Sequence, residues 1–84
     1  MTWTRVWTRP ALRDLQKLDR ERARRIRDAV VRLVESGYGD LAKLTDVTPP
    51  EWRLSVGDQR VFFRYDNASK GIQVLRIRRR DQAY

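Results

Sequence analysis

Apolar residues recur along the chain with two different periods, and the period changes near the middle of the sequence. Over residues 11–34 they return every three or four positions, which is typical of amphipathic helices. Over residues 52–65 they alternate with polar residues, which is typical of strands with one buried face. The opening residues 2–7 alternate Trp and Arg with Thr and Val, which favours an extended strand. The pattern predicts the order strand, helix, helix, strand, strand, strand.

Capping residues and helix breakers bound the two predicted helices. Thr8 is suited to cap the first, and Pro10 falls in its first turn, where a missing N–H does no harm. This helix ends near Leu18. Asp19 is suited to cap the second helix, and Gly37 ends it because glycine tolerates the left-handed conformation. We expect the two helices to form a hairpin whose second member has one apolar and one strongly basic face.

A Gly-Asp pair at residues 57–58 separates two alternating runs and fits the two-residue loop of a type II′ hairpin. Such a turn fixes the register of both strands. It pairs Ser55 with Arg60 and Arg53 with Phe62. These four side chains then share one face of the hairpin, while the apolar side chains fall together on the other face.

Two loops and a last strand complete the predicted fold. Residues 38–50 are expected to form a loop because they contain many helix and strand breakers. The polar residues 66–71 lead to a last strand at residues 72–78. We therefore expect one α+β domain over residues 1–84, with an N-terminal strand, a helical hairpin and a three-stranded antiparallel meander, the helices packing on one face of the sheet.

The pattern leaves the register of the last strand open, because both of its faces are mixed. If Leu75 and Ile77 point to the core, Arg76 and Arg78 join Arg60 on the face away from the helices. The opposite register would separate them. Alternation alone places arginine on the outside of a two-faced sheet, so Arg76 taken singly is expected to be solvated surface.

Composition excludes several classes of protein. The 84 residues include no cysteine and no histidine, so a disulfide framework, a zinc-thiolate site, a cysteine nucleophile and Ser-His-Asp chemistry are all excluded. We expect no metal and no cofactor. Apolar runs stay far below the roughly 18 residues of a membrane span, and residues 1–13 contain no apolar leader, so we expect a cytoplasmic protein without a membrane partner.

The net charge adds a candidate partner. Lys and Arg number 19 against 11 Asp and Glu, a formal charge of +8, and 16 of the basic residues are arginine. Arginine forks two donors onto a phosphate, so this excess points first to nucleic acid and second to an acidic protein. The face predicted around Arg53 and Arg60 adds the ring of Phe62, and exposed rings stack on unpaired bases. Arg64 taken singly is expected to be solvated, whereas the successive arginines 78–80 crowd like charge unless an anion is present.

The run WRLSVGDQRVFFRYD, followed by VLRIRRRDQAY, resembles the RelE/ParE superfamily of toxins from type II toxin-antitoxin pairs. The preceding GYGDLAKL and the opening WTRPALRDLQKL agree with it, so the resemblance covers nearly the whole chain. It implies a compact α+β fold like the one predicted above. For the RelE branch it implies a ribosome-dependent endoribonuclease that cleaves messenger RNA in the ribosomal A site without a metal, by attack of the ribose 2′-hydroxyl. It also implies neutralisation by an antitoxin that wraps the toxin.

The resemblance also assigns roles to individual residues. Arg60 matches the arginine that contacts the scissile phosphate in the family, and Arg53 matches a basic residue on the preceding strand. Arg80 matches the arginine at the end of the last strand, and Tyr84 matches a tyrosine proposed as general base in some members. These four form the implied catalytic set. The implied RNA contacts are Ser55, Phe62, Arg78 and Arg79.

Two alternatives to the nuclease stay open. A ParE-like toxin would inhibit DNA gyrase by binding alone, and a degenerate toxin would only bind its antitoxin. ParE-like members generally lack the catalytic set, so Arg60, Arg80 and Tyr84 together favour the nuclease. The family pattern is altered nearby, since Arg79 stands where many relatives have histidine and Asp81 where many have arginine. Asp81 is the alternative general base.

Overall fold

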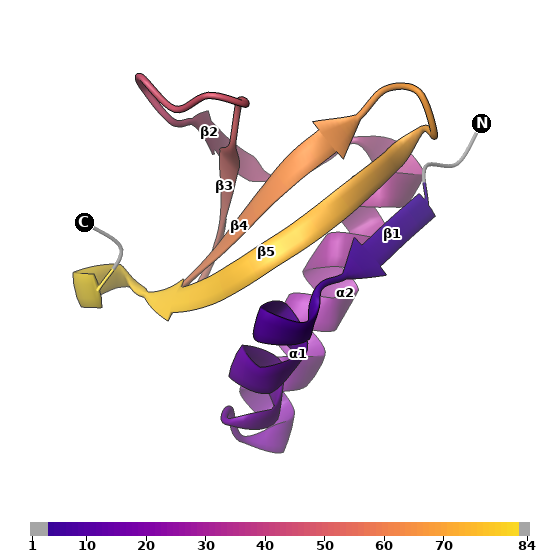
Figure 1. Cartoon of the computed structure of the whole chain (residues 1–84). Helices are drawn as coiled ribbons and strands as arrows, with labels where there is room; N and C mark the ends of the chain where they lie inside the picture. The colour runs from indigo at the N-terminus through magenta and orange to yellow at the C-terminus, as the bar shows by residue number, and fades with distance from the viewer. Residues whose placement is uncertain (1–3, 83–84) are drawn as a thin grey trace.

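The computed structural model describes residues 4–82, which form a sheet with two helices on one of its faces (Figure 1). The sheet has five strands in the order β1-β5-β4-β3-β2. β1 runs parallel to β5, and every other neighbouring pair is antiparallel. The elements are β1 (Thr4–Trp7), α1 (Arg9–Gln16), α2 (Arg20–Ser36), β2 (Asp40–Lys43), β3 (Trp52–Val56), β4 (Gln59–Asp66), β5 (Gly71–Arg79) and a 3₁₀ helix, η1 (Arg80–Gln82).

This architecture confirms the predicted α+β class and corrects the predicted sheet. Residues 38–50 were expected to be a loop, but residues 40–43 form β2, which extends the meander by one strand. Leu41 lies opposite Leu54 and packs against the core. The four residues of β2, DLAK, do not alternate polar and apolar positions, and the breakers that follow them hid the strand in the sequence. The sheet is therefore five-stranded and mixed, since β1 is parallel to β5.

Both helices begin at the residues expected to cap them. The Thr8 hydroxyl accepts a hydrogen bond from the Ala11 N–H at 3.4 Å, and the Asp19 carboxylate accepts one from the Arg22 N–H at 3.2 Å. Gly37 ends α2 with a φ of 72°, a left-handed conformation that is costly for a residue with a side chain. None of the helices in the described part of the chain is long and apolar enough to cross a membrane.

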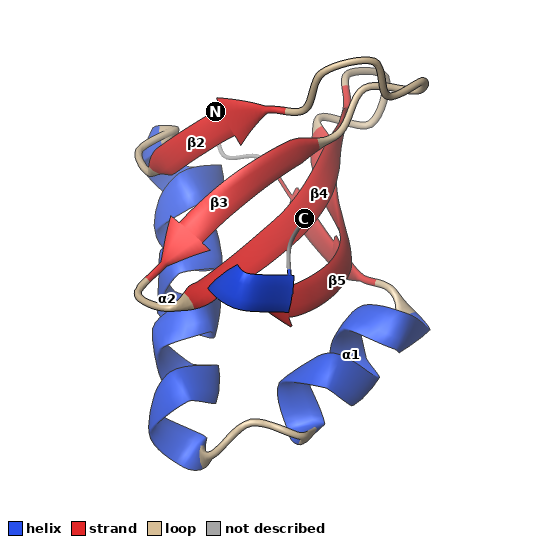
Figure 2. Cartoon of the chain, turned by 90° about the vertical axis from the view of Figure 1, so that its left-hand side faces the viewer, coloured by secondary structure: helices blue, strands red, loops and turns tan. Residues whose placement is uncertain are grey.

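The core lies between the two helices and the inner face of β3, β4 and β5 (Figure 2). The apolar stripe of α2 supplies one side, and the alternating strand residues supply the other, as their periods predict. Large side chains fill the centre and leave little of the small core open to water. The fully buried ones are Ile26, Val30, Leu54, Val61, Phe63, Ile72 and Val74.

A β-bulge sets the register between β4 and β5. Phe62 lies opposite Arg76 and Phe63 lies opposite Val74, so Leu75 is an extra residue between the two pairs. A bulge of this kind gives one strand an unpaired residue and shifts which of its later side chains face inward. Strict alternation cannot reveal it, because it changes the phase of the pattern within the strand.

The bulge settles the question that the sequence left open. Val74 and Ile77 are both buried, although they lie three positions apart and strict alternation would place them on opposite faces. Arg76 and Arg78 consequently share the outer face with Arg60, which lies directly opposite Arg78. The arginines thus gather on the face away from α2 and Ile77 joins the core, as the first of the two registers predicted. Leu75, which that register also placed in the core, is instead the extra residue of the bulge and is only partly buried.

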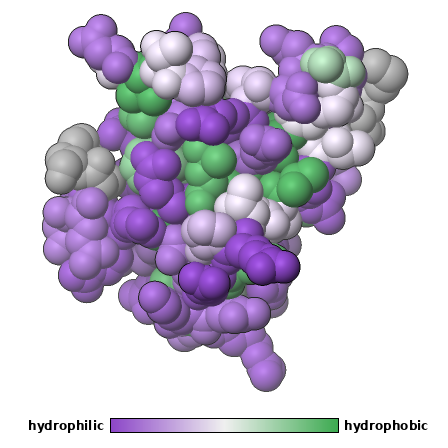
Figure 3. All heavy atoms as spheres, in the orientation of Figure 1, coloured by the Kyte–Doolittle hydropathy of each residue, from purple (hydrophilic) through white to green (hydrophobic). Residues whose placement is uncertain are grey.

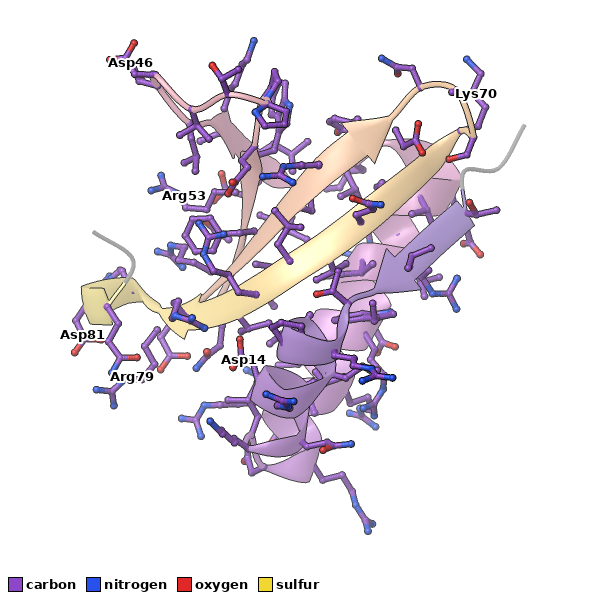
Figure 4. All side chains as sticks on the ribbon, viewed as in Figure 1. Asp14, Asp46, Arg53, Lys70, Arg79 and Asp81 are labelled. Carbon is purple, nitrogen blue, oxygen red and sulfur yellow. The ribbon has the colours of Figure 1, made fainter. Side chains whose placement is uncertain are left out.

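The outer edge of β5 is covered by β1 and then by α1. β1 pairs with residues 71–74 of β5. Beyond that point Asp14 of α1 takes the place of a strand, since its carboxylate accepts hydrogen bonds from the Ile77 N–H at 3.0 Å and from Nη1 of Arg78 at 2.7 Å (Figure 4). A strand edge left uncovered would expose unpaired backbone groups.

We predict that Asp14→Ala lowers the free energy of unfolding by about 2 kcal/mol, because it leaves a part-buried N–H of β5 and an arginine without their acceptor. Urea denaturation with an unchanged m-value measures the loss. Asp28→Ala is the matched control, since Asp28 is exposed on α2, and its effect should stay within about 0.5 kcal/mol. Equal effects of the two substitutions would contradict the role given to Asp14.

Candidate functional site

The outer face of the sheet carries basic side chains from three adjacent strands, and we call it the arginine face. Directly opposed residues of a sheet share a face, so the strand register defines its members. Figure 3 shows the surface over β5, in the orientation of Figure 1, as mostly hydrophilic, with apolar surface between the polar groups. One row across the strands holds Ser55, Arg60 and Arg78, the next holds Arg53, Phe62 and Arg76, and Glu51 and Arg64 lie beyond them.

Arg60 and Arg78 lie directly opposite each other on β4 and β5. Like charges in that position repel. Each guanidinium is held by nearby oxygens: Nη1 of Arg60 donates to the carbonyls of Gly57 and Gln59, both at 2.8 Å, and Nη1 of Arg78 donates to Asp14. A guanidinium has five N–H groups, so both arginines keep further donors for an anion.

Arg53 belongs to the same face. It lies opposite Phe62 of β4 and opposite Ala42 of β2, and it is half-buried. Figure 4 shows its side chain on the side of β3 that faces away from α2. The structure therefore brings together three of the arginines that the sequence singled out, Arg53, Arg60 and Arg78.

Arg79 and Arg80 lie at the margin of the arginine face. Arg79 points to the opposite side of β5 from Arg78, and its Nη2 lies 3.3 Å from the Asp81 carboxylate, with both side chains exposed. Arg80 begins η1, and its backbone N–H donates to the Asp58 carbonyl at 2.8 Å, which holds η1 beside the turn that precedes Arg60. Tyr84, the expected general base, lies outside the described residues.

Phe62 corrects one expectation. The sequence predicted an exposed ring available to stack on a base, but Phe62 is only 3% exposed. The guanidinium carbon of Arg76 lies 4.3 Å from the centre of its ring. Alternation predicts which face of the sheet a side chain lies on but not which neighbours cover it. Here the long side chain of Arg76, on the neighbouring strand, covers the ring of Phe62.

Glu51 is the residue of this face that the sequence reasoning missed. It is 10% exposed, and its two carboxylate oxygens lie 3.2 Å from Nη2 of Arg64 and 3.1 Å from Nη2 of Arg76. A carboxylate buried to this extent requires such partners. Extending the hairpin register by one residue places Glu51 opposite Arg64, so the signal was present. Arg64 and Arg76, expected to be solvated, are therefore structural members of the arginine face.

Tyr65 is a titratable side chain of β4, and its surroundings argue against a role in proton transfer. Its ring packs edge to face with Trp52 and Phe63, at centroid distances of 5.6 and 5.2 Å, on the side of the sheet that faces the core. Burial raises the pKa of Tyr65 above its ordinary value. A general base needs the opposite shift at neutral pH.

Within residues 4–82 no cluster of acidic side chains could hold a metal ion.

Among solved structures, the chain resembles a chain of the archaeal RelE-RelB complex from Pyrococcus horikoshii OT3, with a TM-score of 0.81, 24% identity and coverage of 99% of this chain and 100% of that one. It also resembles a chain of the toxin-antitoxin complex RelBE2 from Mycobacterium tuberculosis (TM-score 0.64, 24% identity, 95% and 100% coverage). A third similar structure is a mutant of the E. coli toxin RelE in the free state (TM-score 0.68, 14% identity, 99% and 88% coverage). At these identities the likeness shows a shared fold.

The family is shown by the sequence itself. No curated protein matches the chain. The family model described as the ParE toxin of type II toxin-antitoxin system, parDE, matches residues 5–84. Because this match spans nearly the whole sequence, the chain belongs to the ParE toxin family, within the RelE/ParE superfamily of type II toxins.

Proposed function

We propose that this toxin is a ribosome-dependent endoribonuclease that cleaves messenger RNA in the ribosomal A site. The observation that supports the proposal most is the gathering of Arg53, Arg60 and Arg78 on one face of three adjacent strands. Neighbouring strands lie about 4.8 Å apart, so guanidinium groups from all three can surround one phosphate. Strands hold such groups more rigidly than loops do.

In the proposed reaction the ribose 2′-oxygen bonds to the adjacent phosphorus and the bond from phosphorus to the 5′-oxygen breaks. The products are a 2′,3′-cyclic phosphate and a free 5′-hydroxyl. A base takes the proton of the 2′-hydroxyl, and the leaving 5′-oxygen gains a proton. The protein must therefore remove one proton, deliver another and stabilise the extra negative charge of the phosphorane.

The arginines supply the charge stabilisation in this scheme. Arg60 and Arg53 bind the phosphorane oxygens, and Arg80 approaches from η1, which the Asp58 carbonyl holds beside the same turn. Tyr84, which follows Arg80 by four positions in the sequence, is the proposed base, since positive charge close to a phenol favours its ionised form. Arginine is a poor proton donor because it stays protonated, so we expect little cleavage of free RNA. The ribosome supplies the orientation of the substrate.

An antitoxin completes the proposal. Two of the similar structures are, by their descriptions, complexes of a toxin with its antitoxin. The formal charge of +8 and the arginine face favour an acidic antitoxin segment that covers the site. Such a segment would block access of RNA to Arg53 and Arg60.

We predict that the purified toxin produces codon-phased cuts when it is added to a translating ribosome system and the messenger RNA ends are mapped by primer extension. Arg60→Ala should reduce the cleavage rate by about 10²- to 10³-fold, as expected for the loss of a group that stabilises developing charge. Tyr84→Phe should reduce it as well, because the base is removed while the ring is kept. Arg24→Ala, on the exposed surface of α2, should leave the rate unchanged. If both Arg60→Ala and Tyr84→Phe cleave at the wild-type rate, the proposed mechanism is wrong.

The second candidate function is inhibition of DNA gyrase by binding alone. It is favoured by one observation, the match of the ParE family model to residues 5–84. On the nuclease proposal we predict that a stoichiometric amount of toxin leaves gyrase supercoiling unaffected and causes no DNA breaks. Gyrase-dependent breaks together with intact messenger RNA would replace the first proposal with the second. Failure of both assays would leave a toxin that only binds its antitoxin.

A further inference from the structure

We infer that Arg76 is a base-stacking residue, which presents the plane of its guanidinium to a nucleobase of the bound RNA. The inference rests on the proposed RNA function and adds to it a contact with a base, since the arginines discussed so far contact phosphate. It depends on three side chains that surround Arg76: Phe62, Glu51 and Arg64.

Phe62 fixes one face of the Arg76 guanidinium. The guanidinium carbon lies 4.3 Å from the ring centre, well within the range of a cation-π contact. The ring beneath is buried, yet the side chain of Arg76 is 35% exposed. Part of the Arg76 side chain therefore remains accessible to a ligand, although the ring that it contacts is buried.

Glu51 fixes the edge of the same group. One of its carboxylate oxygens lies 3.1 Å from Nη2 of Arg76, and the other lies 3.2 Å from Nη2 of Arg64. The carboxylate is thus used by two arginines and cannot turn without losing one of them. Contacts with the ring and with the carboxylate restrict the rotamers of Arg76 before a ligand arrives, which lowers the entropic cost of binding.

The place of Arg76 on the sheet suits a base rather than a second phosphate. Its charge is already opposed by Glu51, and 35% of its side chain remains exposed. Arg guanidinium planes, like aromatic rings, stack on the splayed bases of single-stranded RNA. Arg76 lies two residues before Arg78 on β5, about 7 Å along the strand, so a base on Arg76 adjoins the row that holds the phosphate.

Arg64, on the neighbouring strand β4, provides a matched control because it pairs with the same carboxylate and is equally exposed. Its side chain is 34% exposed, and it pairs with the same carboxylate at a similar distance. Among the described residues, no aromatic ring lies under its guanidinium. A lysine at either position keeps the charge and the reach to Glu51 but lacks the plane.

The test uses ribosomal complexes programmed with synthetic messenger RNA, with single-turnover cleavage measured for the full-length toxin. Arg76→Lys should slow cleavage at least about fivefold, the lower end of what the loss of one base stack costs. Arg64→Lys should stay within twofold of the wild type. Phe62→Leu, which keeps an apolar side chain but removes the ring, should slow cleavage without adding to the effect of Arg76→Lys. If Phe62→Leu does not fold, the comparison of the two lysine variants still decides.

Messenger RNA with one abasic nucleotide distinguishes stacking from a general effect of charge. With the abasic nucleotide placed in turn at each A-site position, the difference between wild type and Arg76→Lys should vanish at one of the three positions. A deficit that persists at all three positions would overturn the inference. So would equal rates for Arg76→Lys and Arg64→Lys in the presence of an active wild type. A wild type that cleaves nothing would refute the proposed function itself, and the inference with it.

Discussion

Leu75 is the bulged residue of β5 and has no partner on β4. The composition of both faces of the sheet depends on the position of this bulge. Before Leu75 the even-numbered residues of β5 face the core, and after it the odd-numbered residues do. Val74 and Ile77 therefore both reach the core. The same change of phase sends Arg76 and Arg78 to the outer face. Without the extra residue, one half of β5 would bury arginine or expose its apolar side chains, and the charged face and the apolar core would be incompatible.

The concentration of positive charge is tolerated because two carboxylates are turned inward among the arginines. Glu51 pairs with Arg64 and Arg76, and Asp14 accepts hydrogen bonds from Arg78 and from a backbone N–H. Isolated surface ion pairs contribute little to stability, but each of these carboxylates is mostly shielded from water and satisfies two groups. They offset repulsion within the protein while leaving the charge of the face strongly positive.

Local signals in the sequence predicted what is local in the fold. The hairpin register was correct because the glycine turn at residues 57–58 determines it within a few residues. The bulge at Leu75 and the short strand β2 were missed, since each depends on how two distant segments match. For the same reason the sequence placed Phe62 on the correct face but gave it the wrong exposure, and it did not connect Glu51 with Arg76. The arginine-rich segment at residues 74–84 resembles that of a toxin family. This resemblance identified candidate residues that the hydrophobic pattern alone could not rank.

The parallel pairing of β1 with β5 has a consequence for the biosynthesis of the chain. The first strand and the start of α1 find their hydrogen-bond partners 66 residues later, where the Thr8 hydroxyl donates to the Val74 carbonyl. Contacts so distant in sequence form late, because the intervening chain must first be closed into a loop. During translation the N-terminal segment therefore has no sheet to join until β5 has left the ribosome. The arginine face is therefore assembled only after β5 has emerged from the ribosome.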